Sequence, residues 1–196
     1  RPYIKDETIA AVATPAGEGG VAIIRVSGAR AIDVAEKVFS GPVRSYASHK
    51  LHFGKIVDLQ GCVVDEVLIV VMKGPHSYTG EDTVEIHCHG GSLITRRVLQ
   101  TVLDVGIARA ALPGEFTFKA YMSGKIDLAQ AEAVQSLIAA KNDLALRAAE
   151  HQLQGALSKK VEQFQKVLFD IAAILEAWVD FPEEGLEFAS MDEVIG

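Results

Sequence analysis

The 196-residue chain carries 26 acidic against 19 basic side chains, a formal net charge of −7. This balance excludes a surface that is basic throughout, as a stand-alone RNA-binding module usually has. The two cysteines, Cys62 and Cys88, are too few for a four-thiolate zinc site or a disulfide framework. We therefore expect a cytoplasmic protein whose two thiols are reduced and at least half-buried.

The length allows one domain with a sizeable core plus an extension. No run approaches the roughly 20 apolar residues that span a bilayer. No secretion signal stands at the start, so we expect no membrane association. The sequence opens on Arg1 rather than Met, and its last residues, Met191–Gly196, do not have the pattern of a finished end, which favours part of a longer protein.

Two-residue alternation predicts strands in the first part of the chain, and three- or four-residue spacing predicts helices. Gly17–Gly20 separates the first two strands. Because a strand follows it, a hairpin turn is favoured over a dinucleotide-binding loop, which leads into a helix. The pattern predicts a sheet domain of the α+β or α/β class. The predicted strands are Ile9–Ala13, Val21–Val26, Leu51–Val57, Val63–Met72, Asp82–Cys88 and Ile107–Leu112, and the predicted helices are Ala29–Phe39 and Gly91–Val105.

The composition changes at Asp127. From there to Phe181 the chain has no proline and a single glycine, Gly155. This predicts two long helices, broken or bent near Gly155. Their apolar stripes are too wide for two helices to cover, so a further segment of the chain or a second copy is expected to pack on them.

Three residues are candidates for ligand binding. Glu85 lies on the polar face of a predicted strand, where a carboxylate suits a ligand that offers paired N–H donors. Arg25 is a permanent cation in an otherwise apolar strand, and Lys125 lies in a helix break beside Gly124. The alternatives are a solvated acid at Glu85, a structural ion pair at Arg25 and a solvated lysine at Lys125.

Two further patterns point away from metal and nucleotide sites. His87 and His89 share one face of the predicted strand, but a metal needs more ligands and His76 is the only near candidate. Structural histidines are therefore favoured. Gly124–Lys125 lacks the upstream glycine and the following Ser or Thr of a phosphate-binding P-loop, so this chain carries no GTPase site of that kind.

The motifs of the chain, taken together, resemble the N-terminal region of the MnmE (TrmE) family of tRNA-modification GTPases. The likeness runs from about residue 6 to 188, with Leu112 and Lys119 standing where the family often has Arg. The matching motifs are Asp6–Ala11 with Thr14–Pro15, Gly17, Gly19 and Gly20; Ile24–Gly28; Ser77–Asp82; His89–Gly91; Pro113–Thr117; Asp127–Ala133; and Val179–Glu184.

The resemblance implies an α+β fold. Residues 1–124 would form a mixed-sheet tetrahydrofolate-binding and dimerisation domain, similar to the glycine-cleavage aminomethyltransferase. Residues 125–196 would be the first long α-helices of a helical domain, cut before the inserted GTPase domain. Arg25, Glu85 and Lys125 match the family's contacts to a 5-formyl-tetrahydrofolate-type ligand. Given such a ligand, we expect Tyr78 to stack on its ring or to line the pocket. A residue of the family's C-terminal tail also lies near the folate.

The resemblance further implies a homodimer that works with the flavoprotein MnmG (GidA) on the wobble uridine C5 of tRNA. The folate would supply the one-carbon unit, and GTP, magnesium and potassium would bind only in the absent GTPase domain. No catalytic residue and no metal ligand is expected in this chain. Two alternatives are a free-standing folate-dependent one-carbon transferase and a structural dimerisation module with an empty pocket.

Overall fold

The computed structural model describes residues 7–180. By its internal contacts the chain divides into two compact units, Arg1–Ile126 and Asp127–Gly196, and each is described by itself. Asp6 of the first motif, most of the last motif and the end of the chain lie outside the described residues.

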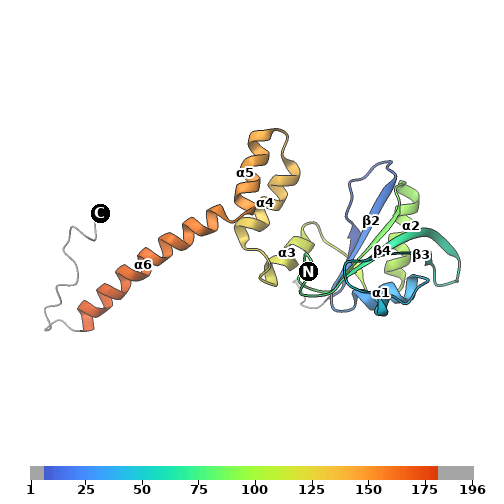
Figure 1. The fold of residues 1–196 in the computed structure, drawn as a ribbon, viewed down its shortest axis with the longest axis horizontal. Coiled ribbons are helices and arrows are strands. Elements are labelled where there is room, and N and C mark those ends of the chain that lie inside the picture. Colours follow the sequence, from blue (N-terminus) through green and yellow to red (C-terminus); the bar gives the residue numbers. More distant parts are fainter. Residues whose placement is uncertain (1–6, 181–196) are drawn as a thin grey trace. The chain divides into compact units, whose positions relative to one another are not determined.

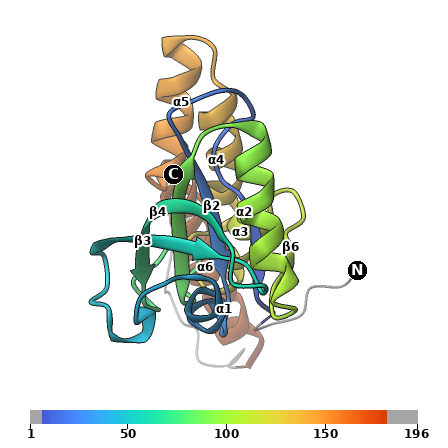
Figure 2. The same cartoon turned by 90° about the vertical axis from the view of Figure 1, so that its right-hand side faces the viewer.

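Unit 1 is built on a mixed six-stranded sheet with the strand order β3-β4-β5-β2-β1-β6 (Figures 1 and 2). Neighbouring strands are antiparallel except for the parallel pair β1 and β6. The hairpin predicted around Gly17–Gly20 is confirmed, because β1 and β2 pair antiparallel on either side of it. The strands are β1 Ile9–Val12, β2 Val21–Ser27, β3 Leu51–Val57, β4 Val63–Met72, β5 Thr83–His89 and β6 Arg109–Ala110.

Two helices, α1 (Ala31–Val38) and α2 (Ser92–Asp104), pack on one face of this sheet and form a single core with it. The register aligns apolar side chains across the strands, so that Ile24 and Ile86 are paired and both are fully buried. Val34 of α1 and Val98 of α2 are also fully buried in this core. The fold is therefore of the α+β class, as expected.

The opposite face of the sheet carries the residues that alternate with the core positions. Arg25 and Glu85 are cross-strand partners on this face. Phe53 and Leu68, paired between β3 and β4, lie in the adjacent row and are 68% and 39% exposed. The loop between β4 and β5 and the short helix α3 (Glu115–Met122) complete unit 1.

Unit 2 contains three helices among the described residues, α4 (Leu128–Ala139), α5 (Asp143–Leu153) and α6 (Ala156–Asp180). The break near Gly155 was expected, but the prediction of two long helices was wrong. The helical pattern also stops at Ala140, whose ψ of 131° leaves the helical region, and Asn142 caps the next helix by accepting the Ala145 N–H at 2.9 Å.

The expectation that both cysteines are at least half-buried holds for one of them. Cys88 is buried, and burial raises the pKa of its thiol above the ordinary value. Cys62 is exposed, because it lies in the turn between β3 and β4, where its N–H is held by the Asp58 carboxylate. Among residues 7–180, no helix combines the length and apolarity required to cross a membrane.

Candidate functional site

Arg25 and Glu85 form an ion pair across the two central strands. The register of β2 and β5 sets the two residues opposite each other, and Arg25 Nε donates to Glu85 Oε1 at 2.8 Å. Their side chains are only 27% and 16% exposed, so the pair is shielded from most of the solvent. A charge-assisted hydrogen bond in this setting fixes both side chains on the sheet face opposite α1 and α2.

The second carboxylate oxygen of Glu85 is less engaged. Within residues 7–180 Glu85 Oε2 accepts no hydrogen bond, and the imidazole Nε2 of His87 lies 3.7 Å from it. That Nε2 atom is buried and also has no hydrogen-bond partner in this part of the chain. A carboxylate held on one side by a guanidinium keeps acceptor capacity for donors from a ligand.

Two aromatic rings flank the guanidinium of Arg25. Its central carbon lies 5.7 Å from the Tyr78 ring and 5.6 Å from the Phe116 ring, within the range of cation–π attraction. Tyr78 comes from the β4–β5 loop and Phe116 from α3, and the Tyr78 hydroxyl lies 3.0 Å from the Thr117 hydroxyl. The guanidinium is therefore held by one carboxylate and two rings from three different segments.

Lys125 is connected to this group through the β4–β5 loop. Its ammonium donates to the Pro75 carbonyl at 3.0 Å, and the same loop carries Tyr78. The Lys125 side chain also lies close to Gly80 of this loop. A Cβ atom added to Gly80 would be 3.3 Å from the Cγ atom of Lys125. The structure thus brings Arg25 and Glu85 into direct contact, and links exposed Lys125 to them by way of this loop.

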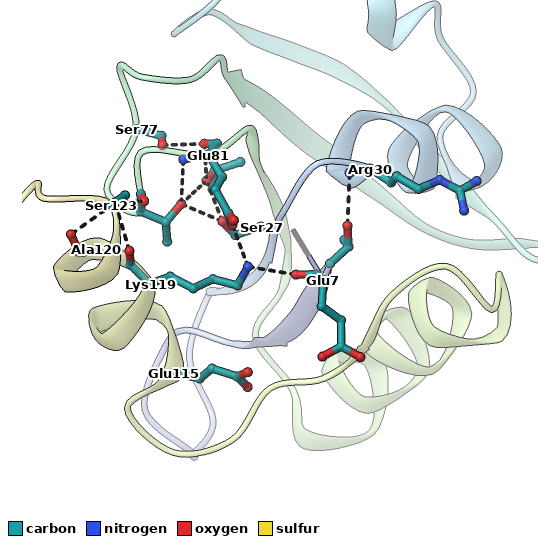
Figure 3. A network of polar contacts seen from close by, with 12 residues as sticks. Glu7, Ser27, Arg30, Ser77, Glu81, Glu115, Lys119, Ala120 and Ser123 are labelled. Carbon is teal, nitrogen blue, oxygen red and sulfur yellow. Dashed lines mark hydrogen bonds and ion pairs between the residues drawn. The ribbon is translucent and has the colours of Figure 1, made fainter. Parts of the chain in front are cut away.

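A buried lysine supports the same loop from α3. Lys119 is 1% exposed, and its ammonium lies 2.7 Å from Glu81 Oε2 and 2.8 Å from the Glu7 carbonyl oxygen (Figure 3). Lys119, one of the two predicted departures, is therefore a buried, ion-paired residue. Leu112, the other departure, is 54% exposed, and its backbone N–H donates to Glu115.

A second charged cluster joins α3 to β6. Arg109 donates two hydrogen bonds to the Glu115 carboxylate, which holds the pKa of Glu115 below its ordinary value. Arg109 Nε also lies 2.8 Å from Glu7 Oε2. The two groups form an ion pair, but the angle at the N–H does not suit a hydrogen bond. This cluster fixes the start of α3, the helix that brings Phe116 to Arg25.

A separate cavity of about 630 Å³ lies between the β1–β2 loop and α2, lined by side chains such as Val12, Pro15 and Leu99. None of the three predicted site residues lines it. Among residues 7–180, no three His, Cys, Asp or Glu side chains are grouped to hold a metal ion. His89, one of the two histidines considered for metal binding, instead has its Nδ1 2.7 Å from Asp65.

The sequence reasoning missed three neighbours of the site. Phe116 was recognised only as part of a motif, His87 only as a metal candidate, and Lys119 only as a departure from the family. Helical spacing signals that a residue lies on a given face of α3, but contact with Arg25 depends on how α3 docks on the sheet.

Comparison with known proteins identifies the class. A family model described as "GTP-binding protein TrmE N-terminus" matches residues 8–125. A second, described as "MnmE helical domain", matches residues 128–196. The chain therefore belongs to the TrmE/MnmE family and spans its N-terminal domain and part of its helical domain.

Curated relatives carry the name tRNA modification GTPase MnmE. The protein of Protochlamydia amoebophila is 69% identical over 194 residues, which is 99% of this chain and 42% of that protein. Those of Geobacter sulfurreducens and Chlamydia pneumoniae are 50% and 46% identical, over 97% and 92% of this chain. The chain spans 40–42% of the length of these relatives.

Proposed function

We propose that unit 1 binds a reduced folate of the 5-formyl-tetrahydrofolate type through Arg25, Glu85 and Lys125. The observation that carries the proposal is the shielded Arg25–Glu85 pair, in which one carboxylate oxygen keeps free acceptor capacity. The pterin head of a folate offers a 2-amino group and a ring N–H side by side. These two donors can bond to the two oxygens of one carboxylate, in the same way as two parallel N–H groups of a guanidinium do.

The neighbouring groups suit the rest of such a ligand. Arg25 and Lys125 supply positive charge for its carbonyl, formyl or glutamate-tail oxygens. The rings of Tyr78 and Phe116, which flank Arg25, supply flat apolar surface for a flat heterocycle. In this proposal the residues of the chain bind and orient the folate, and the folate supplies the one-carbon chemistry.

Calorimetric titration of the chain with 5-formyl-tetrahydrofolate tests the site. Glu85→Gln should weaken binding about 10- to 100-fold, because an amide replaces a charged acceptor of paired donors. Arg25→Ala should weaken binding by a similar factor. Glu66→Gln is the matched control: Glu66 lies in the neighbouring strand β4, paired with exposed Lys55 at 3.6 Å, and its loss should change the affinity less than twofold.

Absence of binding to the unaltered chain at high micromolar ligand would reject the folate site and favour the structural module. Equal affinities for the unaltered chain and Glu85→Gln would reject the assignment of Glu85.

We also propose that two copies of the chain associate through unit 1. The sheet face opposite α1 and α2 supports this, because Leu51, Phe53 and Leu68 are large apolar side chains exposed on adjacent strands. Sedimentation velocity should show a dimer that Phe53→Glu converts to a monomer. Leu59→Glu, at a 59% exposed leucine in the β3–β4 turn, is the control and should leave the dimer intact. A dimer that survives Phe53→Glu would exclude this face.

For the intact protein we propose a cytoplasmic tRNA-modification GTPase. The names of the relatives and the helical-domain match support this over a free-standing one-carbon transferase. It would act with the flavoprotein MnmG on the wobble uridine C5 of tRNA, and bind GTP, magnesium and potassium in a GTPase domain. Genomic sequence beyond the codon for Gly196 tests it: a G-x-x-x-x-G-K-[ST] loop is expected, and an ending without one would reject the GTPase.

A further inference from the structure

The β4–β5 loop and α3 hold each other through a buried ion pair. Lys119 is 1% exposed, and Glu81, its partner at 2.7 Å, has a side chain 18% exposed. A buried ammonium is costly unless it is paired and hydrogen-bonded. Lys119 therefore favours one arrangement, in which Glu81 and the Glu7 carbonyl oxygen both reach its ammonium.

Hydroxyl groups around Glu81 fix the rest of the loop tip. The Ser27 and Thr79 hydroxyls lie 2.7 Å apart, and Ser27 and Thr83 lie 3.1 Å apart, all three residues being buried. The Ser77 hydroxyl donates to the Glu81 carbonyl, and the Ser123 hydroxyl of the chain after α3 donates to the Thr79 carbonyl (Figure 3). The loop is thus tied both to β2 and to α3.

Two groups of the candidate site sit on this loop. The Tyr78 ring lies against the guanidinium of Arg25, and the Pro75 carbonyl holds the ammonium of Lys125. The Lys119–Glu81 ion pair is distinct from the Arg25–Glu85 pair, and the loop that carries Glu81 also carries Tyr78. The loop therefore connects the buried pair to the residues around Arg25.

We infer that Lys119 and Glu81 are positioning residues of the ligand site: their ion pair fixes the β4–β5 loop, which holds Tyr78 against the Arg25 guanidinium and the Pro75 carbonyl against the Lys125 ammonium. The inference rests on the proposed folate function. Physically, it is preorganisation, because a loop already fixed by α3 spares the ligand the entropy cost of ordering it.

Calorimetric titration of the chain with 5-formyl-tetrahydrofolate tests this inference. Lys119→Met, which keeps the length of the side chain and removes its charge, should weaken binding at least tenfold. Glu81→Gln should weaken it by about the same factor. Lys119→Arg should stay within threefold of the unaltered chain, because a guanidinium restores the ion pair.

A double-mutant cycle separates positioning from plain stabilisation. If Lys119 acts through the loop, Tyr78→Ala removes most of what Lys119 contributes, and the affinity losses of the two variants are not additive. If Lys119 only stabilises the fold, the two losses add. Val98→Ala, a buried cavity variant in α2 away from the loop, should lower thermal stability and leave the affinity unchanged.

Three results would overturn the inference: unchanged affinity in folded Lys119→Met, additive losses in the cycle, or a comparable affinity loss in Val98→Ala. Should Lys119→Met fail to fold, Glu81→Gln carries the same test, because Glu81 is only partly buried. Failure of the unaltered chain to bind the folate is a different outcome, which rejects the proposed function itself.

Discussion

The two units of this chain bury their apolar side chains to very different extents. Unit 1 encloses a core between its sheet, α1 and α2, in which Ile24, Ile86 and Val98 are fully buried. In unit 2 the 25-residue helix α6 has no buried residue, and Phe164 and Phe169 are 70% and 72% exposed. Unit 1 thus carries its own hydrophobic stabilisation, whereas α6 draws little from the described residues.

The candidate ligand site lies in unit 1, the unit with the buried core. A site needs side chains held by rigid elements, and unit 1 supplies central strands whose register fixes Arg25 beside Glu85. The exposed stripe of α6 has the composition of a packing surface rather than of a binding site for a polar ligand. The family's further helical segments, or a second copy, remain our proposal for what covers it.

The largest expected effect comes from opening the core of unit 1. Ile86→Ala should lower the free energy of amide opening in β5 by about 2–5 kcal/mol, because it leaves a cavity in a closely packed core. Phe164→Ala in α6 is the comparison and should change stability by less than about 0.5 kcal/mol. Hydrogen exchange followed by mass spectrometry resolves the two units. A large loss from Phe164→Ala would show that α6 is packed against a partner in solution.

An intermediate effect is expected from the Arg109–Glu115 pair. The folded pKa of Glu115 is lowered, so its stabilisation is complete above the ordinary carboxyl pKa of about 4.3 and is lost as the pH falls through the lower folded pKa. Glu115→Gln should cost about 1–3 kcal/mol near neutral pH and less in acid. Urea unfolding across the acid range measures this, with Glu66→Gln as the exposed control. A pH-independent cost would contradict the assignment.

The smallest effect is expected in unit 2, at the start of α4. Asp127 accepts the Gln130 N–H at 2.8 Å and the Ser158 hydroxyl at 2.6 Å, and these bonds lower its pKa. Asp127→Ala should cost about 0.5–2 kcal/mol, a contribution that disappears as acid protonates the carboxylate. Exchange of α4 amides reports it. Asp143→Ala, in the first turn of α5 without a capping bond, should cost less, and equal costs would show that capping is unimportant here.

Local sequence predicted much of the fold of unit 1. The bounds predicted for β3 and β4, Leu51–Val57 and Val63–Met72, are those of the structure, because alternation and the turn between them are local signals. The break before Asn142 was missed, because neither proline nor glycine marks it. The sequence signal for this break was Asn142, a residue type that often caps helices. That signal is weak as long as the end of the preceding helix is not known.

The site was predictable in its residues and not in its contacts. Alternation indicated that Glu85 faces away from Val84 and Ile86, and Arg25 was conspicuous in an apolar strand. That the two form an ion pair depends on the register of two strands, because Arg25 and Glu85 are 60 residues apart in the sequence. The buried position of Lys119 was equally hidden, since lysine is almost always exposed and only the docking of α3 buries this one.

By itself the sequence determined the family, the strands and the two helices that pack on the sheet, because motifs, turns and periodicity act over short stretches of chain. Only the tertiary structure decided which charges meet, namely Arg25 with Glu85 and Lys119 with Glu81. The physical reason is that an ion pair between distant segments exists only once packing has removed water and fixed the register. A buried charge is then stable only where its partner has been brought to it.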